Sequence, residues 1–477
     1  MSILGAKQIT SEDAAAARQR DLDIGRGDIP MPSAAADRPG AAGYKEEGPP
    51  PLSSVADTGL DRGFLQTLAL KVMNAHGGKT AAEVAEVMKL PARIVRELLE
   101  SLRARGQLET LGNEQMGLQF DLRYVISGAG IDWVQKALKQ SEYVGPAPVP
   151  LAAWQAQVVR QSITKDRVDQ AAVAKSLSGL VLAPEMVARL GPAVNAGRGI
   201  LLYGAPGDGK TSIATAIANS FKQPVWVPYA IEVEGEIVKI YDPALHREFD
   251  AAPGVVATQD DHEPTAVRPR VTAEDRRWVR CARPIVTIGG ELTMDMLDLK
   301  FDHLARFYVA PLHIKVTGGV FVIDDFGRQI ATPEQVLNRW VMPLESRIDY
   351  LTLHTGKKFC VIFDGLVIFS TNLTPRTIMD SAMMRRIPYN FYIGPPTGED
   401  YVEIFRRVCA TAGVPFDMEA LQSVMALLYG QEKLALARFH PRFIIEHVLA
   451  RCDYEGRAPT LDKELALDAA GHLFTKQ

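Results

Sequence analysis

The sequence has few of the features that define several common classes of protein. Its 477 residues include only four cysteines, which are scattered without a Cys-x-x-Cys pair or a Cys/His cluster. This spacing argues against the usual zinc sites and disulfide frameworks. No apolar run approaches the ~20 residues of a membrane span, and the N-terminus lacks the apolar core of a signal peptide. We therefore expect a soluble, cytoplasmic protein with no membrane partner.

A strong charge of one sign is also missing. The 53 Lys and Arg residues nearly balance the 57 Asp and Glu residues, which leaves a net charge of -4. This balance argues against a protein that coats nucleic acid with its whole surface, although a local basic face is compatible with it. The length predicts two to four domains, at about 150 residues for each domain.

Two stretches of unusual composition predict domain boundaries. Residues 1–58 are rich in Ala, Gly, Pro, Asp and Ser and have few large apolar residues, which predicts a disordered tail. The stretch YVGPAPVP at residues 143–150 holds three prolines and predicts a linker that separates two modules. We assign residues 143–174 to this linker and a following helix.

The module at residues 59–142 shows three amphipathic helical patterns followed by two alternating, strand-like segments. Thr80 and Glu83 have the spacing of a capping box at the start of the second helix. This order resembles a winged helix-turn-helix domain, which implies DNA as a partner. Residues 61–140, however, carry 11 Lys and Arg against 9 Asp and Glu, and acids interrupt the arginines of the third helix. Because phosphate contacts need unpaired cations, we favour protein interaction or self-association over DNA binding.

The strongest motif is GAPGDGKT at residues 204–211. It follows the apolar run ILLY and precedes the helical pattern SIATAIANSF, so a glycine-rich turn opens a helix, where backbone N–H groups favour phosphate. We predict nucleotide binding, with Lys210 reaching the β- and γ-phosphates and the Thr211 hydroxyl ligating Mg²⁺. The predicted contacts are Gly204, Ala205, Pro206, Gly207, Asp208, Gly209, Lys210, Thr211 and Ser212.

Polar side chains follow two later apolar runs, where strands are expected to end. GVFVI is followed by Asp324 and Asp325, and LVIF is followed by a segment that ends in Asn372. A carboxylate at such a strand end can hold Mg²⁺ through water, and a second acid can orient or deprotonate the attacking water. We therefore predict Asp324 as a metal-site residue with Thr211, and Asp325 and Asn372 as catalytic residues.

From residue 151 to 396 apolar strand patterns alternate with helical ones, which predicts a three-layer α/β domain, and residues 397–477 read as a small helical lid. Over roughly residues 175–477 the chain resembles the AAA+ ATPases, with the α/β core at 175–396. GAPGDGKT resembles Walker A, VFVIDD resembles Walker B, and IFSTN resembles sensor 1. DSAMMRRI resembles the segment with the arginine finger, and HPRF resembles sensor 2. The series in this order is more specific than any later motif alone.

The resemblance implies that ATP and Mg²⁺ bind between the protomers of a homo-oligomer, such as a ring. It implies that Arg385 or Arg386 reaches into a neighbour's site, and that Arg442 senses the γ-phosphate from the lid. Such arginines stabilise the charge that spreads over the transferred phosphoryl group. Most of the family has Asp-Glu at Walker B, whereas this chain has Asp-Asp, which is shorter by one methylene and implies slow or partner-dependent hydrolysis.

The segment between Walker B and sensor 1 alternates around His354 to Lys357 and predicts a β-hairpin. It is similar to the hairpin before sensor 1 in the clade that includes MoxR-like chaperones, and DDFGRQ is similar to their Asp-Glu-x-Asn-Arg segment, which aligns Arg328. Such proteins usually lack a winged helix. Residues 232–318 form a long, unfamiliar stretch, which we expect to be an insertion that contacts a substrate or partner.

Three functions are compatible with these patterns. The first is an oligomeric, ATP-hydrolysing remodelling or assembly factor that acts on a protein client. The second is a DNA-linked regulator that uses the winged helix for targeting and ATP as a switch. The third is a nucleotide-sensing scaffold with little turnover.

Overall fold

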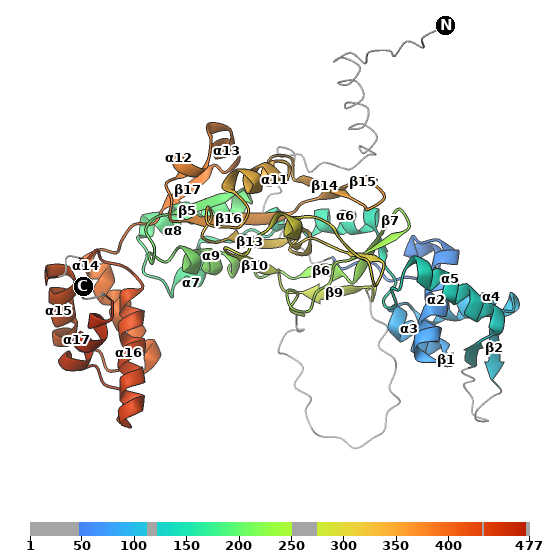
Figure 1. The fold of residues 1–477 in the computed structure, drawn as a ribbon, viewed down its shortest axis with the longest axis horizontal. Coiled ribbons are helices and arrows are strands. Elements are labelled where there is room, and N and C mark those ends of the chain that lie inside the picture. Colours follow the sequence, from blue (N-terminus) through green and yellow to red (C-terminus); the bar gives the residue numbers. More distant parts are fainter. Residues whose placement is uncertain (1–46, 112–121, 250–273, 432–433, 474–477) are drawn as a thin grey trace, which may run out of the picture.

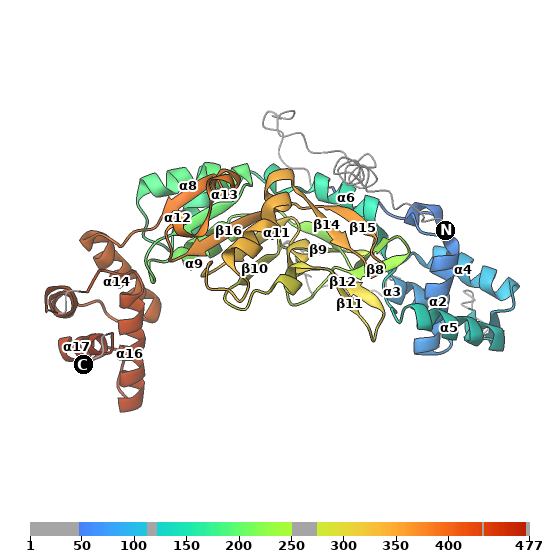
Figure 2. The ribbon, with the colours of Figure 1, turned by 45° about the horizontal axis from the view of Figure 1, so that its top comes forward.

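The computed structural model describes residues 47–111, 122–249, 274–431 and 434–473. Figures 1 and 2 show an α/β part in the middle, a helical unit with the C-terminus at one end and a unit of helices and short strands at the other. Most of the predicted tail, residues 1–46, lies outside the described residues, as does the polar stretch TQDDHEPTAVRPR of the predicted insertion.

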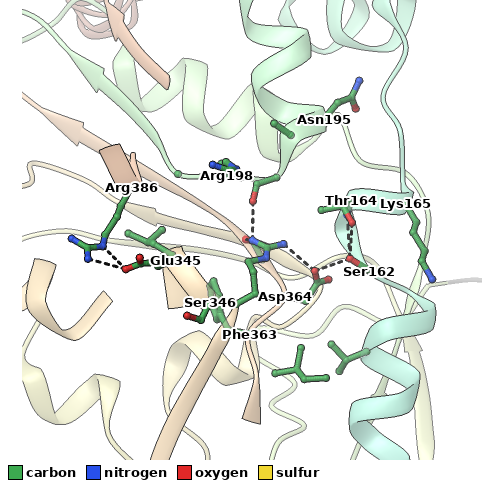
Figure 3. A pocket seen from close by; sticks show the side chains of 18 of the residues that line it. Ser162, Thr164, Lys165, Asn195, Arg198, Glu345, Ser346, Phe363, Asp364 and Arg386 are labelled. Atoms are coloured by element: carbon green, nitrogen blue, oxygen red, sulfur yellow. Dashed lines mark hydrogen bonds and ion pairs between the residues drawn. The ribbon is translucent and has the colours of Figure 1, made fainter. Parts of the chain in front are cut away.

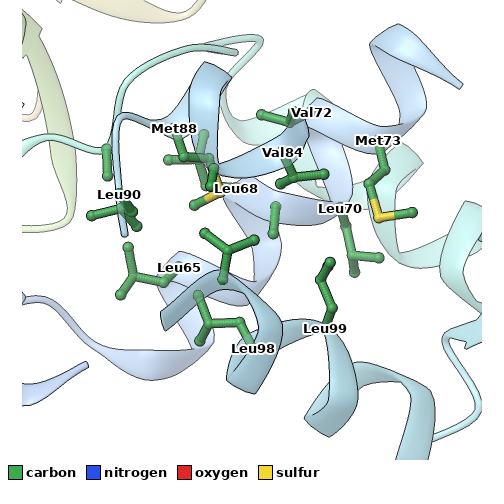
Figure 4. Close-up of a cluster of buried hydrophobic side chains, with 14 of the residues drawn as sticks. Leu65, Leu68, Leu70, Val72, Met73, Val84, Met88, Leu90, Leu98 and Leu99 are labelled. Atoms are coloured by element: carbon green, nitrogen blue, oxygen red, sulfur yellow. The ribbon is translucent and has the colours of Figure 1, made fainter. Parts of the chain in front are cut away.

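The N-terminal unit combines helices with a small antiparallel sheet. Its helical elements are η1 (Ala56–Thr58), α2 (Arg62–His76), α3 (Ala81–Met88), α4 (Ala92–Ala104) and α5 (Gly128–Gln140). Its strands β1 (Lys79–Thr80), β2 (Leu108–Leu111) and β3 (Arg123–Ile126) pair in the order β1-β3-β2. The capping box is confirmed, because the Thr80 hydroxyl accepts from Glu83 N and the Glu83 carboxylate accepts from Thr80 N. Aliphatic side chains of α2, α3 and α4 form the core in Figure 4. The winged helix itself stays a prediction.

The segments on either side of this unit are packed against the rest of the chain. The predicted disorder is wrong for residues 47–58, since Asp275 donates its N–H to Pro49 O at 3.1 Å and Leu52 is buried. The predicted linker is also packed, since Ala147 donates its N–H to Met88 O at 2.8 Å. Proline-rich composition indicated irregular backbone, but the apolar residues between the prolines, such as the fully buried Val149, hold it in place.

The central sheet has five parallel strands in the order β10-β13-β16-β5-β17. They are β5 (Ile200–Tyr203), β10 (Ile285–Ile288), β13 (Gly319–Ile323), β16 (Gly365–Thr371) and β17 (Tyr389–Tyr392). One face packs against α7 (Gln170–Leu177), α8 (Pro184–Ala196) and α9 (Lys210–Ala218). The other packs against α11 (Pro333–Ser346) and α13 (Ser381–Arg386). Burial on both faces explains the uninterrupted apolar runs and confirms the predicted three-layer α/β fold.

The expected single insertion at residues 232–318 is wrong in one respect. It contains β10, an edge strand of the central sheet that pairs in parallel with β13. A second five-stranded sheet, in the order β11-β12-β8-β7-β4, lies between the central sheet and the N-terminal unit (Figure 1). Its strands are β4 (Val149–Pro150), β7 (Ala230–Val233), β8 (Glu236–Lys239), β11 (Lys300–Asp302) and β12 (Phe307–Val309). Strands β6 (Val225–Pro228) and β9 (Trp278–Cys281) pair separately.

The predicted hairpin before sensor 1 is confirmed as β14 (Ile348–Thr352) and β15 (Lys358–Ile362), which pair antiparallel. Its tip is covered by the second sheet. The His354 ring stacks on Phe301 with centroids 4.4 Å apart, and its Nδ1 contacts the Tyr308 hydroxyl. No sequence pattern indicated this cover, because the contact joins segments about fifty residues apart in the chain.

The lid region consists of helices with a core of their own. It comprises α14 (Gly398–Ala412), α15 (Met418–Met425), a π-helical turn (Ala426–Gln431), α16 (His440–Glu455) and α17 (Lys463–Gly471). The remaining elements are α6 (Leu151–Arg160), η2 (Ile163–Lys165), η3 (Met294–Leu297), α10 (Leu312–Lys315) and α12 (Pro375–Ile378). All four cysteines are described, buried and free. Within the described part of the chain, no helix has both the length and the apolar character to cross a membrane.

Candidate nucleotide-binding site

A cavity of about 630 Å³ lies where β5, β13 and β16 end and meet the lid. We call it the nucleotide cavity. It is lined by residues 179–182, 206–213, Asp324, Asp325, Ser370, Asn372, Ile404, Arg407, Val408, Arg438, Phe439 and Arg442. Ligands of open α/β sheets bind in the crevice outside the carboxyl ends of the strands, and this cavity has that position.

The glycine-rich turn between β5 and α9 needs its glycines. Gly207 and Gly209 have φ of 85° and 86°, a region that other residues rarely adopt. A Cβ on Gly204 would overlap the Ile393 carbonyl oxygen, and a Cβ on Gly207 would overlap the ring of Phe439. Since Phe439 comes from the lid, the close approach of lid and loop depends on the missing side chain.

Lys210 begins α9 and is 6% exposed. Its ammonium donates to Gly204 O at 3.1 Å, to Ala205 O at 2.8 Å and to Asn372 Oδ1 at 2.6 Å. Burial lowers the pKa of Lys210, while nearby carboxylates act in the opposite direction. The positive charge is therefore held at the mouth of the phosphate loop and tied to the end of β16.

The ends of β13 and β16 are joined to the loop by two further hydrogen bonds. The Thr211 hydroxyl donates to Asp324 Oδ2 at 2.7 Å, and the Asn372 amide donates to Asp325 Oδ1 at 2.8 Å. The structure thus brings together Lys210, Thr211, Asp324, Asp325 and Asn372, which the sequence placed at three separate strand ends.

Asp325 has a φ of 47°, an uncommon value for a residue other than glycine. Two hydrogen bonds hold the turn that contains Asp325. Phe326 donates its N–H to Ser370 O at 2.7 Å, and the Gln329 amide donates to Asp324 O at 2.8 Å. Backbone strain of this kind persists where the surroundings fix it, and it aims the Asp325 carboxylate at Asn372.

The neighbouring Thr211 hydroxyl and Asp324 carboxylate are oxygen donors of the kind that Mg²⁺ prefers. Across the described ranges, no group of three or more His, Cys, Asp or Glu residues could hold a metal. A protein site this sparse fits Mg²⁺, because that ion usually takes one or two protein ligands and completes its shell with phosphates and water.

The predicted arginines lie at two different places. Arg385 and Arg386 on α13 line another cavity, at the opposite end of the central sheet, and Arg386 pairs with Glu345 at 2.8 Å. They are thus not near the phosphate loop of their own chain. Arg442 does line the nucleotide cavity, but its side chain is 77% exposed and pairs with Glu446 at 2.7 Å.

Two lid arginines that line the nucleotide cavity were not predicted from the sequence. Arg438 donates to Val181 O, and Arg407 donates to Ser178 O at 2.6 Å, so both hold the segment that precedes α8. Arg438 Nε and Asp208 Oδ2 are buried and have no hydrogen-bond partner among the described residues. The resemblance of HPRF to sensor 2 predicted Arg442, whereas no motif predicted Arg438.

The parallel strand order, the glycine-rich turn and the polar strand ends define a P-loop protein with a helical lid. A stretch of the chain is 28% identical to the ribosome biogenesis ATPase RIX7 of Saccharomyces cerevisiae, over 32% of this chain and 22% of that protein. The chain therefore spans about a fifth of the length of this relative. In its fold and in the order of its motifs the chain resembles the AAA+ P-loop proteins.

Two further comparisons give no information about function. Residues 397–472 match a family described as a domain of unknown function (DUF8689). Two single-residue mutants of RuvB from Thermotoga maritima are 15% identical, with TM-scores of 0.32 and 0.33. The matches cover 65% and 66% of this chain and 73% of each RuvB chain. TM-scores this low carry no argument about activity.

Proposed function

We propose that the protein binds ATP with Mg²⁺ and hydrolyses it. The observation that carries this proposal is the continuous set of contacts from Lys210 through Asn372 to Asp325, with Thr211 and Asp324 beside it. A glycine-rich surface turn would have no reason to be bonded to the ends of two neighbouring strands. The 28% identity to a protein named as an ATPase supports the same reaction.

In this proposal Lys210 and the backbone N–H groups at the start of α9 bind the β- and γ-phosphates. Thr211 and Asp324 would hold Mg²⁺, which neutralises negative charge on the phosphates when bound. Asp325 orients the attacking water and accepts its proton, and the Asn372 amide fixes the Asp325 carboxylate for that task. The shorter side chain of Asp325 is compensated in part by this fixed orientation.

We further propose that the protein acts as a homo-oligomer. Arg385 and Arg386 line the cavity at the opposite end of the sheet, so they can serve a nucleotide only if it is bound to another protomer. Arg442, in the first turn of lid helix α16, and Phe439, just before that helix, lie next to the phosphate loop. Nucleotide-dependent movement of this lid would then be passed to a neighbour or a protein client.

The N-terminal unit favours a protein partner over DNA. Arg62 pairs with Glu97 at 3.0 Å and Arg103 pairs with Glu100 at 2.6 Å. Arg93 donates to Leu52 O. Because these cations are engaged within the protein, they are less available for phosphates. Salt-dependent retention of the full chain on duplex DNA would favour the DNA-linked regulator instead.

The test is steady-state ATP hydrolysis combined with molar mass from light scattering, for wild type and Asp325→Asn, with and without ATP. Turnover in an ATP-dependent oligomer that is lost in the variant would support the proposal. Binding without turnover in a monomer would replace it with the nucleotide-sensing scaffold. Equal turnover in both proteins would contradict the assignment of Asp325.

A further inference from the structure

A second cavity, of about 920 Å³, lies at the amino ends of β5 and β16, so the central sheet separates it from the nucleotide cavity. Its walls come from η2, the end of α8, the end of α11, the turn after β15 and α13. We call it the basic cavity, because six cationic side chains line it. These are Lys165, Arg167, Arg198, Arg347, Arg385 and Arg386. Figure 3 shows several of them.

Most of this positive charge is not neutralised. The acidic residues of the lining are Glu345, paired with Arg386 at 2.8 Å, and Asp364, paired with Arg347 at 3.1 Å. The other four cations form no side-chain hydrogen bond or ion pair within the described part of the chain. They are Lys165, Arg167, Arg198 and Arg385. In a chain with a net charge of -4, four free cations around one hollow indicate an anionic ligand.

The wall between these cations is rigid. Arg347 donates to Gly197 O at 2.8 Å and to Gly365 O at 2.9 Å, which joins α8 to the start of β16. Asp364 accepts from the Ser162 hydroxyl and from Ile163 N, both at 2.8 Å, which adds η2 to the same frame. A cavity whose shape is set before binding loses less entropy when a ligand enters.

The remaining lining mixes polar and apolar side chains. The polar ones are Ser162, Thr164, Asn195 and Ser346, and the apolar ones include Val158, Val159, Leu344, Ile362, Phe363 and Ala382. Among the described lining residues Phe363 is the one aromatic side chain, and it is 2% exposed. Single-stranded nucleic acids are held by exposed aromatic rings on which bases stack, and this cavity offers none from its described lining. Apolar side chains beside a cationic rim suit a ligand that carries both apolar groups and carboxylates.

We propose that the basic cavity binds an acidic peptide segment of a partner protein. Apolar side chains of the segment contact the aliphatic lining, and its carboxylates pair with Lys165, Arg167 and Arg198, since the proposed function assigns Arg385 to a neighbour's nucleotide. Arginine is suited to this task, because its planar group binds a carboxylate through two parallel hydrogen bonds. The site does not depend on the nucleotide cavity, so it stands even if the proposed ATP hydrolysis fails.

The experiment measures fluorescence anisotropy of a labelled synthetic peptide, with Leu and Glu alternating, against the full-length protein. The test variant is Arg198→Glu combined with Lys165→Glu, because both side chains are exposed and neither contacts the phosphate loop. Lys136→Glu, on the exposed face of α5, is a control for charge reversal outside the cavity. We expect the test variant to bind at least about tenfold more weakly and the control to bind as wild type does.

Retained ADP binding and an unchanged circular dichroism spectrum in the test variant show that it is folded. Equal affinity for a peptide of Glu alone would overturn the proposal, since it requires the apolar lining. Tighter binding of a single-stranded oligonucleotide, lost in the same variant, would assign the cavity to nucleic acid instead. If wild type binds no peptide and the test variant loses its oligomers, the basic cavity is instead a contact between copies of this chain.

Discussion

The two cavities of the central sheet differ in how their charges are used. In the nucleotide cavity Lys210, Thr211, Asp325 and Asn372 are bonded to one another or to the loop. In the basic cavity four cations have no such partner within the described residues. A reaction needs groups that are oriented before the substrate arrives, whereas recognition of an anion needs charges that remain available. The amount of internal bonding therefore distinguishes the two tasks on one scaffold.

The largest expected effect concerns two arginines that line the basic cavity but are expected to act on a nucleotide. Arg385 and Arg386 line the basic cavity, yet the AAA+ resemblance assigns them to a neighbour's nucleotide. Replacing both with Ala should lower ATP turnover by about 10³-fold in the assembled state, because such arginines stabilise charge on the transferred phosphoryl group. Nucleotide affinity of the isolated protomer should be nearly unchanged, which titration with ADP would check.

Mixing provides the control for this prediction. The double variant keeps its own phosphate loop, and Lys210→Ala keeps its arginines, so mixed oligomers should regain part of the turnover. Failure to regain any, when light scattering shows that mixed oligomers form, would mean that the arginines do not act between protomers.

The second effect concerns Asp325. Asp325→Asn should lower turnover by about 10²–10⁴-fold, because the amide cannot accept a proton from water. Asn also tolerates the positive φ of 47° at this position, so the turn should be preserved. ADP affinity within a few-fold of wild type would show that the loss is chemical, whereas a parallel loss of ADP binding would point to a disturbed site.

The third effect is on binding. Lys210→Ala should weaken ATP and ADP by about 100-fold, because a buried ammonium facing the phosphates is removed. Calorimetric titration measures this loss, with Lys136→Ala as the control. Acidic-peptide binding at the basic cavity should not change in the variant. A loss of peptide binding would show that the two cavities are coupled.

The strand-end residues could be predicted from sequence because each lies within a few residues of a recognisable apolar run. Lys210, Asp324 and Asn372 follow β5, β13 and β16, and parallel strands bring their carboxyl ends to one edge. The same periodicity supports the helical lid and the hairpin before sensor 1. Local pattern was sufficient wherever one strand or one helix determined the position of the residue.

Features that depend on contacts between distant segments could not be predicted in this way. β10 lies in the central sheet although the surrounding sequence reads as an insertion. The four free cations of the basic cavity come from residues 165 to 385, and no motif links them. Arg438 reaches Val181, which is far away in the sequence, so only the folded chain places it at the phosphate loop.

The smallest expected effect tests the one buried acid of the phosphate loop. Asp208 is 1% exposed, and Arg438 is the lid cation whose charge acts on it. Asp208→Asn removes a negative charge beside the site of the phosphates, so it should strengthen ATP binding by about twofold to fivefold. Asp132→Asn, on exposed α5, is the matched control. Weaker binding in the variant would indicate that Asp208 positions Arg438 rather than opposing the phosphates.

The same residue gives a pH dependence of known sign. Burial raises the pKa of Asp208 above its ordinary 3.8, so between that value and the raised pKa the folded state binds more protons than the unfolded state. Stability of the wild type should therefore fall relative to Asp208→Asn as the pH rises through this window. Urea unfolding of both proteins across a pH series measures the difference. A difference that does not change with pH would mean that the lid arginine already compensates the charge of Asp208, although the two side chains share no hydrogen bond.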